Sequence, residues 1–140
     1  MTSVPQVVWM PGGTRTEIHL GAEDTAGAFC LLVDHPPAGW SLPAHLHHGA
    51  AETIHIVHGE FEVEMEGRRI ALAAGETVHV PADTVHATAN VGASEGRRVL
   101  VFSPAGMERF FLEAGAPTPD EPPDAAQALA TAIRHGWEFV

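Results

Sequence analysis

The sequence predicts an all-β fold. Residues 61–65 (Phe-Glu-Val-Glu-Met) alternate between apolar and acidic side chains, the pattern of a strand with one face on a core and the other in water. Further short apolar runs follow one another with turn residues at close intervals, which is typical of a β-sandwich or barrel. With 140 residues, of which 45% are hydrophobic, the chain can bury a core and form a single domain over residues 1–140.

The same patterns place the strands in chain order. Turn residues 34–39 end the second strand, and Glu66-Gly67-Arg68-Arg69 makes a hairpin. Arg68-Arg69 and Arg97-Arg98 both fall in predicted turns, where we expect solvated charges. Besides the segments around His45, His47 and Glu52 discussed below, we expect strands at residues 14–20, 28–33, 61–65, 70–72, 77–80, 86–90 and 99–102.

The tail of the chain has a different period. Met107, Phe110, Phe111 and Ala114 recur at helical spacing, and Gly115 is suited to end that helix. A second helix is expected over residues 125–135, with Asp124 as its N-cap and Gly136 as its stop. We therefore expect a barrel at about residues 14–104 and a helical tail at about residues 105–140.

Composition excludes several classes of function. No apolar run approaches 18 residues, so no membrane-spanning helix is expected. The net charge is −11 and no basic stripe is visible, which argues against nucleic acid and anionic membranes as partners. The N-terminus lacks the basic and apolar stretches of a secretory signal, so a cytoplasmic location is expected. The single cysteine, Cys30, lies in an apolar run and is expected to be a buried hydrophobe.

The middle of the chain carries a candidate metal site. His45 and His47 can share one face of a strand because side chains alternate. Glu52 follows after a possible turn at residues 49–51, and His86 would arrive from a distant strand. Four such nitrogen and oxygen donors suit a single divalent transition metal. In a chain with 10 histidines, however, the His-x-His pair alone is equally consistent with a surface loop.

Two blocks of sequence resemble the two motifs of the cupin family. The first, residues 39–59, reads GWSLPAHLHHGAAETIHIVHG, and the second, residues 75–90, reads GETVHVPADTVHATAN. The short spacer between them, residues 60–74, is typical of small microbial cupins, and residues 102–111 resemble the equivalent region of quercetin dioxygenase-like cupins. Asp83 stands where the family usually has glycine, and aspartate tolerates the positive φ that a glycine would permit.

The resemblance implies a double-stranded β-helix (jelly-roll) barrel with short C-terminal helices and a metal held by His45, His47, Glu52 and His86. In this arrangement the two histidines of the first motif share one strand, Glu52 opens the neighbouring antiparallel strand, and His86 comes from across the barrel. Iron, manganese, nickel, copper, cobalt and zinc all accept these donors. The absence of a cysteine ligand favours an open, reactive site over a closed structural one.

The other histidines are expected elsewhere. His48 should point away from the metal. His55, His58 and His79 are candidates to line the cavity or its rim, and each is expected to be a packed or surface histidine rather than a ligand. Among these, His58 has the same strand parity as Glu52, which makes it the first to test as an additional ligand.

Dioxygenase chemistry is the leading functional hypothesis that the resemblance implies. A flavonol, β-diketone or similar enolisable molecule would be the substrate, with Glu52 as both ligand and base. Apolar residues that could lie near the mouth and hold it are Trp40, Ile54, Ile56, Met65 and Phe102, although for each one alone core packing is the preferred interpretation. The alternatives are a non-oxidative metal-dependent cyclase or isomerase, and a cupin that binds a small molecule or metal without turnover. The family also implies a homodimer, for which the apolar run at residues 7–10 offers a sheet edge.

Overall fold

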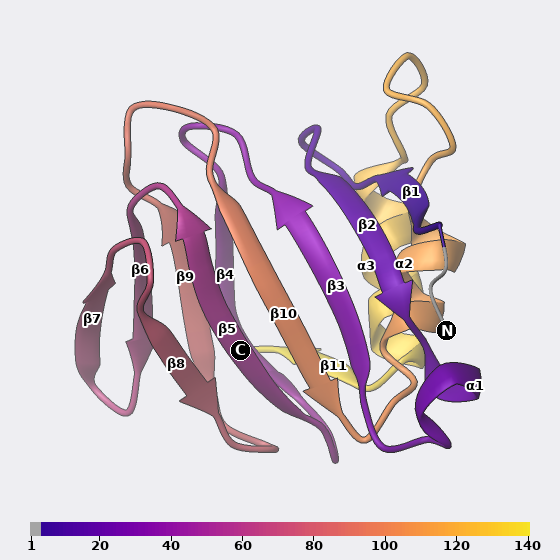
Figure 1. Cartoon of the computed structure of the whole chain (residues 1–140), viewed down its shortest axis with the longest axis horizontal. Helices are drawn as coiled ribbons and strands as arrows, with labels where there is room; N and C mark the ends of the chain where they lie inside the picture. Colours follow the sequence, from indigo (N-terminus) through magenta and orange to yellow (C-terminus); the bar gives the residue numbers. More distant parts are fainter. Residues whose placement is uncertain (1–3) are drawn as a thin grey trace.

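Two antiparallel β-sheets face each other in the computed structural model, which describes residues 4–140 (Figure 1). The six-stranded sheet has the order β1-β2-β3-β10-β5-β8, and the five-stranded sheet has the order β11-β4-β9-β6-β7. Residues 1–3, the start of the predicted domain, lie outside the described residues. The strands are β1 (Gln6–Trp9), β2 (Arg15–Leu20), β3 (Cys30–His35), β4 (Ser41–His47), β5 (Ala51–His58), β6 (Phe61–Met65), β7 (Arg68–Leu72), β8 (Thr77–Val80), β9 (His86–Asn90), β10 (Arg97–Ser103) and β11 (Trp137–Phe139). The predicted all-β fold is confirmed.

The alternating sequence of β6 explains its place between β7 and β9. Phe61 and Val63 are buried in the core between the sheets, whereas the glutamates of the strand face outward. Glu66 and Gly67 both have positive φ, at 54° and 73°, as a two-residue hairpin turn requires. The predicted hairpin between β6 and β7 is therefore confirmed.

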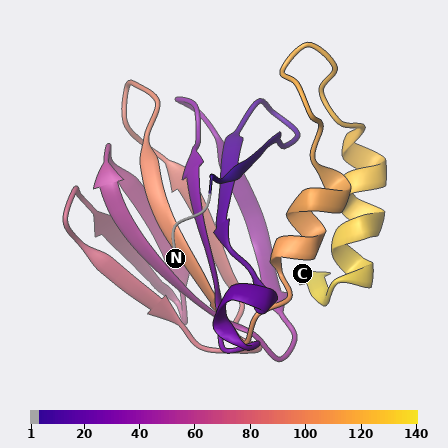
Figure 2. The same ribbon diagram turned by 45° about the vertical axis from the view of Figure 1, so that its right-hand side comes forward.

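Within the described part of the chain, three helices accompany the sheets: α1 (Ala22–Thr25), α2 (Glu108–Ala114) and α3 (Ala125–Arg134). The carboxylate of Asp124 accepts a hydrogen bond from the Ala126 amide at 2.8 Å, which confirms the predicted N-cap of α3. Figure 2 shows α2 and α3 side by side, next to β1, β2 and β3. The two C-terminal helices were thus predicted, although α1 was not. No helix among residues 4–140 is long and apolar enough to cross a membrane.

The last strand, β11, was not predicted. It lies within the segment expected to be a helical tail and pairs with β4, so that Trp137 lies opposite His47 and Phe139 opposite His45. A strand of three residues is too short to show an alternating pattern. Its consequence is that the C-terminus lines the sheet edge beside the two histidines.

The predicted arrangement of the metal-site strands is wrong in two respects. His86 does not come from across the barrel, because β9 is a neighbour of β4 in the same sheet and His86 lies directly opposite His45. β5, with Glu52, belongs to the opposite sheet. The sequence spacing suggested a simple hairpin between β4 and β5, but the connection at residues 48–50 crosses from one sheet to the other.

Arg98 was predicted to be a solvated charge, and this prediction is wrong. The prediction that the second strand ends before Asp34 is also wrong. Both residues lie inside strands and are buried, with exposed fractions of 3% and 4%. The guanidinium makes a paired contact with the carboxylate, Nε to Oδ1 at 3.0 Å and Nη2 to Oδ2 at 2.7 Å. Each charge can enter the interior because the other one neutralises it. Arg97, on the opposite face of β10, is exposed as predicted.

The apolar run at residues 7–10 is used within this chain. β1 pairs with β2, and the side chains of Val8 and Met10 are buried. Trp9 forms an isolated bridge with Ala116 along its other side. The apolar side chains of this run therefore pack within the chain's own core, and the homodimer stays a prediction.

Candidate metal centre

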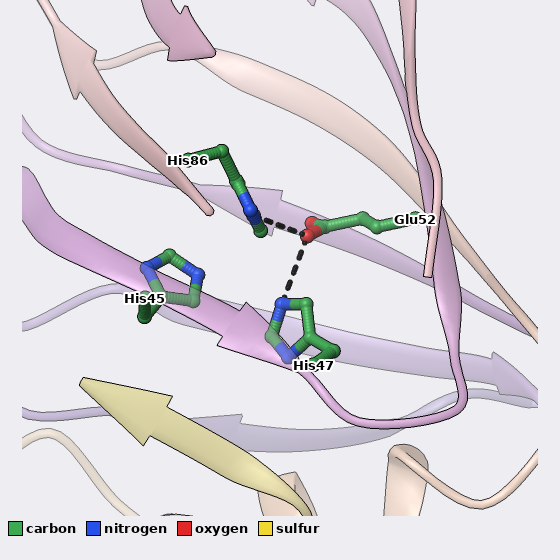
Figure 3. A group of neighbouring side chains, drawn as sticks. All are labelled: His45, His47, Glu52 and His86. Carbon is green, nitrogen blue, oxygen red and sulfur yellow. Dashed lines mark hydrogen bonds and ion pairs between the residues drawn. The ribbon is translucent and has the colours of Figure 1, made fainter. Parts of the chain in front are cut away.

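The four predicted residues lie together between the two sheets (Figure 3). β4 contributes His45 and His47, β9 contributes His86, and β5 contributes Glu52 from the opposite sheet. One nitrogen or oxygen atom from each side chain lies within 4.8 Å of the others, and all four residues are buried. Such a cluster could hold a metal ion.

Two backbone carbonyls determine which nitrogen His45 and His86 present. The Nδ1–H of His45 donates to the carbonyl of Pro43 at 2.7 Å, and that of His86 donates to the carbonyl of Thr84 at 2.9 Å. In both rings this leaves the Nε2 lone pair for the centre of the cluster. Fixing the tautomer through the other ring nitrogen is how proteins orient metal-binding histidines.

Glu52 is the only anion of the cluster. Its Oε1 lies 3.1 Å from Nε2 of His47 and 3.3 Å from Nε2 of His86. Burial acts to raise the pKa of Glu52, but hydrogen bonds and charge interactions with the two histidines outweigh it and hold the pKa well below its usual range. The carboxylate is therefore ionised, as metal binding requires.

The pKa values of His45 and His86 are shifted in opposite directions. Burial, together with the neighbouring His86 and His47, lowers the pKa of His45 to about 4, so its ring is neutral at pH 7. Burial also acts against protonation of His86, yet its contact with Glu52 raises the pKa of His86 above the ordinary value. A cation bound in the centre would be an alternative positive partner for Glu52.

Aromatic side chains enclose the histidines on the side of β11. The ring of Trp137 stacks on His45 at 4.9 Å and meets the edge of His47 at 4.5 Å between centroids. Phe102 lies on another side of His47, 5.4 Å away. The Nδ1 atom of His47 is buried without a hydrogen-bond partner. Aromatic packing and the Nε2 contact with Glu52, rather than a hydrogen bond at Nδ1, therefore hold the His47 ring.

The residues fit a divalent transition metal. They offer three imidazoles and one carboxylate, a donor set that iron, manganese, nickel, copper, cobalt and zinc accept. Four protein donors leave room for exogenous ligands in a five- or six-coordinate site. Asp83, the residue of the second motif that departs from the family pattern, also supports the site. Its φ is 62°, and its carboxylate accepts a hydrogen bond from the Gly49 amide at 3.1 Å.

A cavity of about 690 Å³ extends from this cluster between the sheets. His45, His47 and Glu52 form part of its wall, and Trp40 and Phe102 also line it, as predicted. The volume is in the range of sites for small organic molecules.

Three residues predicted to hold the substrate lie elsewhere. Ile54 and Ile56 are in the core but do not line the cavity, and Met65 borders a separate pocket near β7. The aromatic lining that sequence reasoning missed comes from the C-terminal segment: Phe110, Phe111, Trp137 and Phe139. The helical spacing of Phe110 and Phe111 indicated a buried face, but not that this face borders the cavity.

The remaining predicted histidines stay outside the cluster. His48 points away, with 56% of its side chain exposed, as predicted. His55 and His79 contact threonines on the outer face of the sheet, at 2.8 and 2.9 Å. His58 is exposed although it has the parity of Glu52, because a register shift pairs it with the outward-facing Arg97.

The fold and the cluster define a class of protein. The family profile described as "Cupin domain" matches residues 31–102, and the chain belongs to the cupin family. Among solved structures, it is similar to KdgF from Halomonas sp., with a TM-score of 0.66, 20% identity and coverage of 74% of this chain and 91% of the other. An RmlC-like cupin from Shewanella frigidimarina has a TM-score of 0.64 and 21% identity over 75% of this chain and 88% of its own. These structures share the fold.

Two curated relatives add specific names. The chain is 30% identical over 108 residues to the quercetin 2,3-dioxygenase of Bacillus subtilis (strain 168), a match that covers 77% of this chain and 32% of the relative. It is 33% identical over 89 residues to the polyketide synthase CurC of Streptomyces cyaneus, covering 64% of this chain and 55% of the relative. The chain thus spans about a third and about half of the lengths of these relatives.

Proposed function

We propose that this protein is a mononuclear metal-dependent dioxygenase that acts on a small enolisable molecule such as a flavonol or a β-diketone. One observation carries the proposal: in a buried cluster of three histidines and a glutamate, His45, His47 and Glu52 form part of the wall of an organic-sized cavity. A purely structural metal site would not need such a space beside it. The similarity to a quercetin 2,3-dioxygenase favours oxygen chemistry within the family.

In this proposal His45, His47, Glu52 and His86 hold one ion of iron, manganese, nickel, copper, cobalt or zinc. When bound, such an ion supplies Lewis acidity, and a redox-active one also permits electron transfer between substrate and O₂.

The chain's own residues contribute binding and proton transfer. The Nδ1–H bonds of His45 and His86 to backbone carbonyls fix both rings before the substrate arrives. Glu52 uses Oε1 for both histidine contacts, so we assign Oε2 as the atom that accepts the enol proton of the substrate. Trp40 and Phe102 are on the cavity wall, where they can pack against a flat molecule and exclude water.

Oxygen uptake tests this function. Metal-free protein is reconstituted separately with iron, manganese, nickel and copper, and O₂ consumption is followed with a flavonol and with a β-diketone. At least one pairing of metal and substrate is expected to consume O₂ in proportion to the substrate cleaved. Fully loaded protein that consumes no O₂ in any pairing would contradict the proposal.

The similarity to a polyketide synthase supports a second candidate, a non-oxidative cyclase or isomerase. In that case the zinc-loaded protein would rearrange a poly-β-ketone without consuming O₂. A cupin that binds a small molecule without turnover would bind both substrate types and convert neither. The homodimer, the cytoplasmic location and the lack of nucleic-acid partners stay predictions from the sequence.

A further inference from the structure

The cavity has a second polar region that the proposed metal chemistry does not use. Arg98 and Asp34, the buried ion pair, line the same cavity as His45, His47 and Glu52. The ring of Trp40 lies against the guanidinium, with Cζ 4.7 Å from the ring centre. Thr88 Oγ1 is 3.4 Å from Nη1. A charged group is therefore held by protein contacts in the wall of an otherwise largely apolar space.

Some hydrogen-bonding groups of this region have no partner within the described part of the protein. Of the five N–H groups of a guanidinium, three have acceptors in Asp34 and Thr88, so two remain for a ligand. The hydroxyl of Thr14 also lines the cavity and is buried without a hydrogen-bond partner. Buried polar groups are normally satisfied, and those left over in a cavity wall indicate what a ligand would supply.

Strand geometry sets the distance between the two polar regions. On β10, Phe102 lies opposite Glu52. Arg98 precedes Phe102 by four residues and lies on the same inward face of the strand. That is roughly 13 Å of strand. On β9, Thr88, which Arg98 contacts, is two residues or about 7 Å from His86. A molecule of about two or three linked aromatic rings spans this interval.

The charges of the two regions differ. A divalent ion with Glu52 as its single anionic ligand carries a net charge of +1, which an enolate or phenolate oxygen balances. The second region is already neutral, since Asp34 compensates Arg98 at 2.7 Å. It therefore suits an uncharged hydroxyl or carbonyl, and a carboxylate there would meet Asp34 as well as Arg98.

We propose that Arg98, held by Asp34, binds a neutral hydroxyl or carbonyl at the far end of a flat substrate whose enolisable end lies at the metal centre. This inference rests on the proposed function and narrows its substrate class to hydroxylated aromatic molecules of flavonol size. Arg98 is then a specificity-determining residue.

Paired probes test this role without turnover. The dissociation constants of 3-hydroxyflavone and of its 4′-hydroxy derivative are measured for metal-loaded protein in the absence of O₂. The added hydroxyl is expected to tighten binding by at least about tenfold, the effect of a hydrogen bond to a charged group. In the double variant Arg98→Met/Asp34→Leu, this advantage should fall below about twofold while 3-hydroxyflavone binds as before. Arg97→Met, which changes the exposed neighbour, should keep the discrimination.

The outcomes separate the two proposals. Equal affinity for both probes in the unaltered protein, retained discrimination in the double variant, or no binding of either probe would overturn the role of Arg98. Metal content of the double variant, expected to equal that of the unaltered protein, shows that its fold and metal centre survive. Hydroxyl-dependent binding without O₂ uptake would leave the role of Arg98 standing and overturn the dioxygenase.

Discussion

Asp83 illustrates how one side chain can take over a position that favours glycine. Its backbone adopts a left-handed φ of 62°, which aspartate tolerates because its short carboxylate can bond locally. That carboxylate accepts from the Gly49 amide, and the Asp83 amide donates to the carbonyl of His47 at 3.0 Å. The turn before His86 is thereby joined to the end of β4, and two ligand-bearing segments are held together.

The Arg98–Asp34 pair makes a prediction about stability. Asp34→Ala removes the partner of a buried guanidinium and should lower the free energy of unfolding by about 3–5 kcal/mol. The double variant Arg98→Met/Asp34→Leu leaves no unpaired charge and should recover most of that loss. Urea unfolding followed by circular dichroism measures both. A double variant no more stable than the single one would show that the pair is required as such.

The thiol of Cys30 should be unreactive in the folded protein. Its exposed fraction is 0%, and burial, assisted by the negative charge of Glu108, raises the pKa of its thiol to about 11. At pH 8 the folded protein should therefore react far more slowly with Ellman's reagent than the urea-unfolded protein, which should release one equivalent. Rapid reaction under native conditions would contradict the burial of this thiol.

At the scale of elements, β11 encloses the candidate metal site. Its Trp137 contacts both His45 and His47, and its indole N–H donates to the sulfur of Met107 at 3.0 Å. The strand thus connects the helical segment to the ligand strand β4. Residues that come last in the chain thereby complete the surroundings of ligands in its middle.

Removal of the Trp137 side chain should destabilise the folded protein. Trp137→Ala leaves a cavity between α2 and β4 and is expected to lower the free energy of unfolding by about 3–5 kcal/mol. Glu138→Ala, on the exposed side of the same strand, should change it by less than about 0.5 kcal/mol. Denaturant titration of the two variants checks this difference. Equal stabilities would mean that β11 does not pack as described.

The predictability of the elements followed their length and regularity. β6 and its hairpin were evident because five alternating residues precede a glutamate–glycine turn. β11 could not be found in this way, since three residues define no period. The sequence pattern also could not show which sheet contains β5, because a short connection fits a hairpin and a crossing between sheets equally well.

On the scale of the whole molecule, the candidate centre joins the two sheets. Three of its residues come from the sheet that contains β4 and β9, and Glu52 comes from the other. A metal bound there would stabilise the folded state, because an unfolded chain does not bring the four donors together.

Metal removal should therefore lower the melting temperature. At a free metal concentration of about 100 times Kd, binding adds about 2.7 kcal/mol, which corresponds to roughly 10 °C for a chain of this size. Calorimetry of the chelator-treated and reloaded protein measures the difference. The His86→Ala variant should show no such gain on addition of metal, and a gain as large as that of the unaltered protein would contradict the proposed centre.

That the four candidate metal-binding residues lie together could be predicted because local spacing and the two motifs single them out. His45 and His47 alternate on one strand, and the second motif supplies His86. The role of Arg98 could not be predicted, since its partner Asp34 is 64 residues away and an arginine pair near a turn is usually solvated. Long-range pairing of buried charges leaves no periodic signal in the sequence.

The metal content of untagged protein tests the central proposal most directly. Elemental analysis of the unaltered chain should find about one equivalent of a divalent transition metal per chain. Glu52→Gln and His86→Ala should each reduce occupancy at limiting metal by at least about tenfold. His48→Ala, which alters an exposed neighbour of the ligands, should leave it unchanged. Full occupancy in both Glu52→Gln and His86→Ala would contradict the four-residue metal centre.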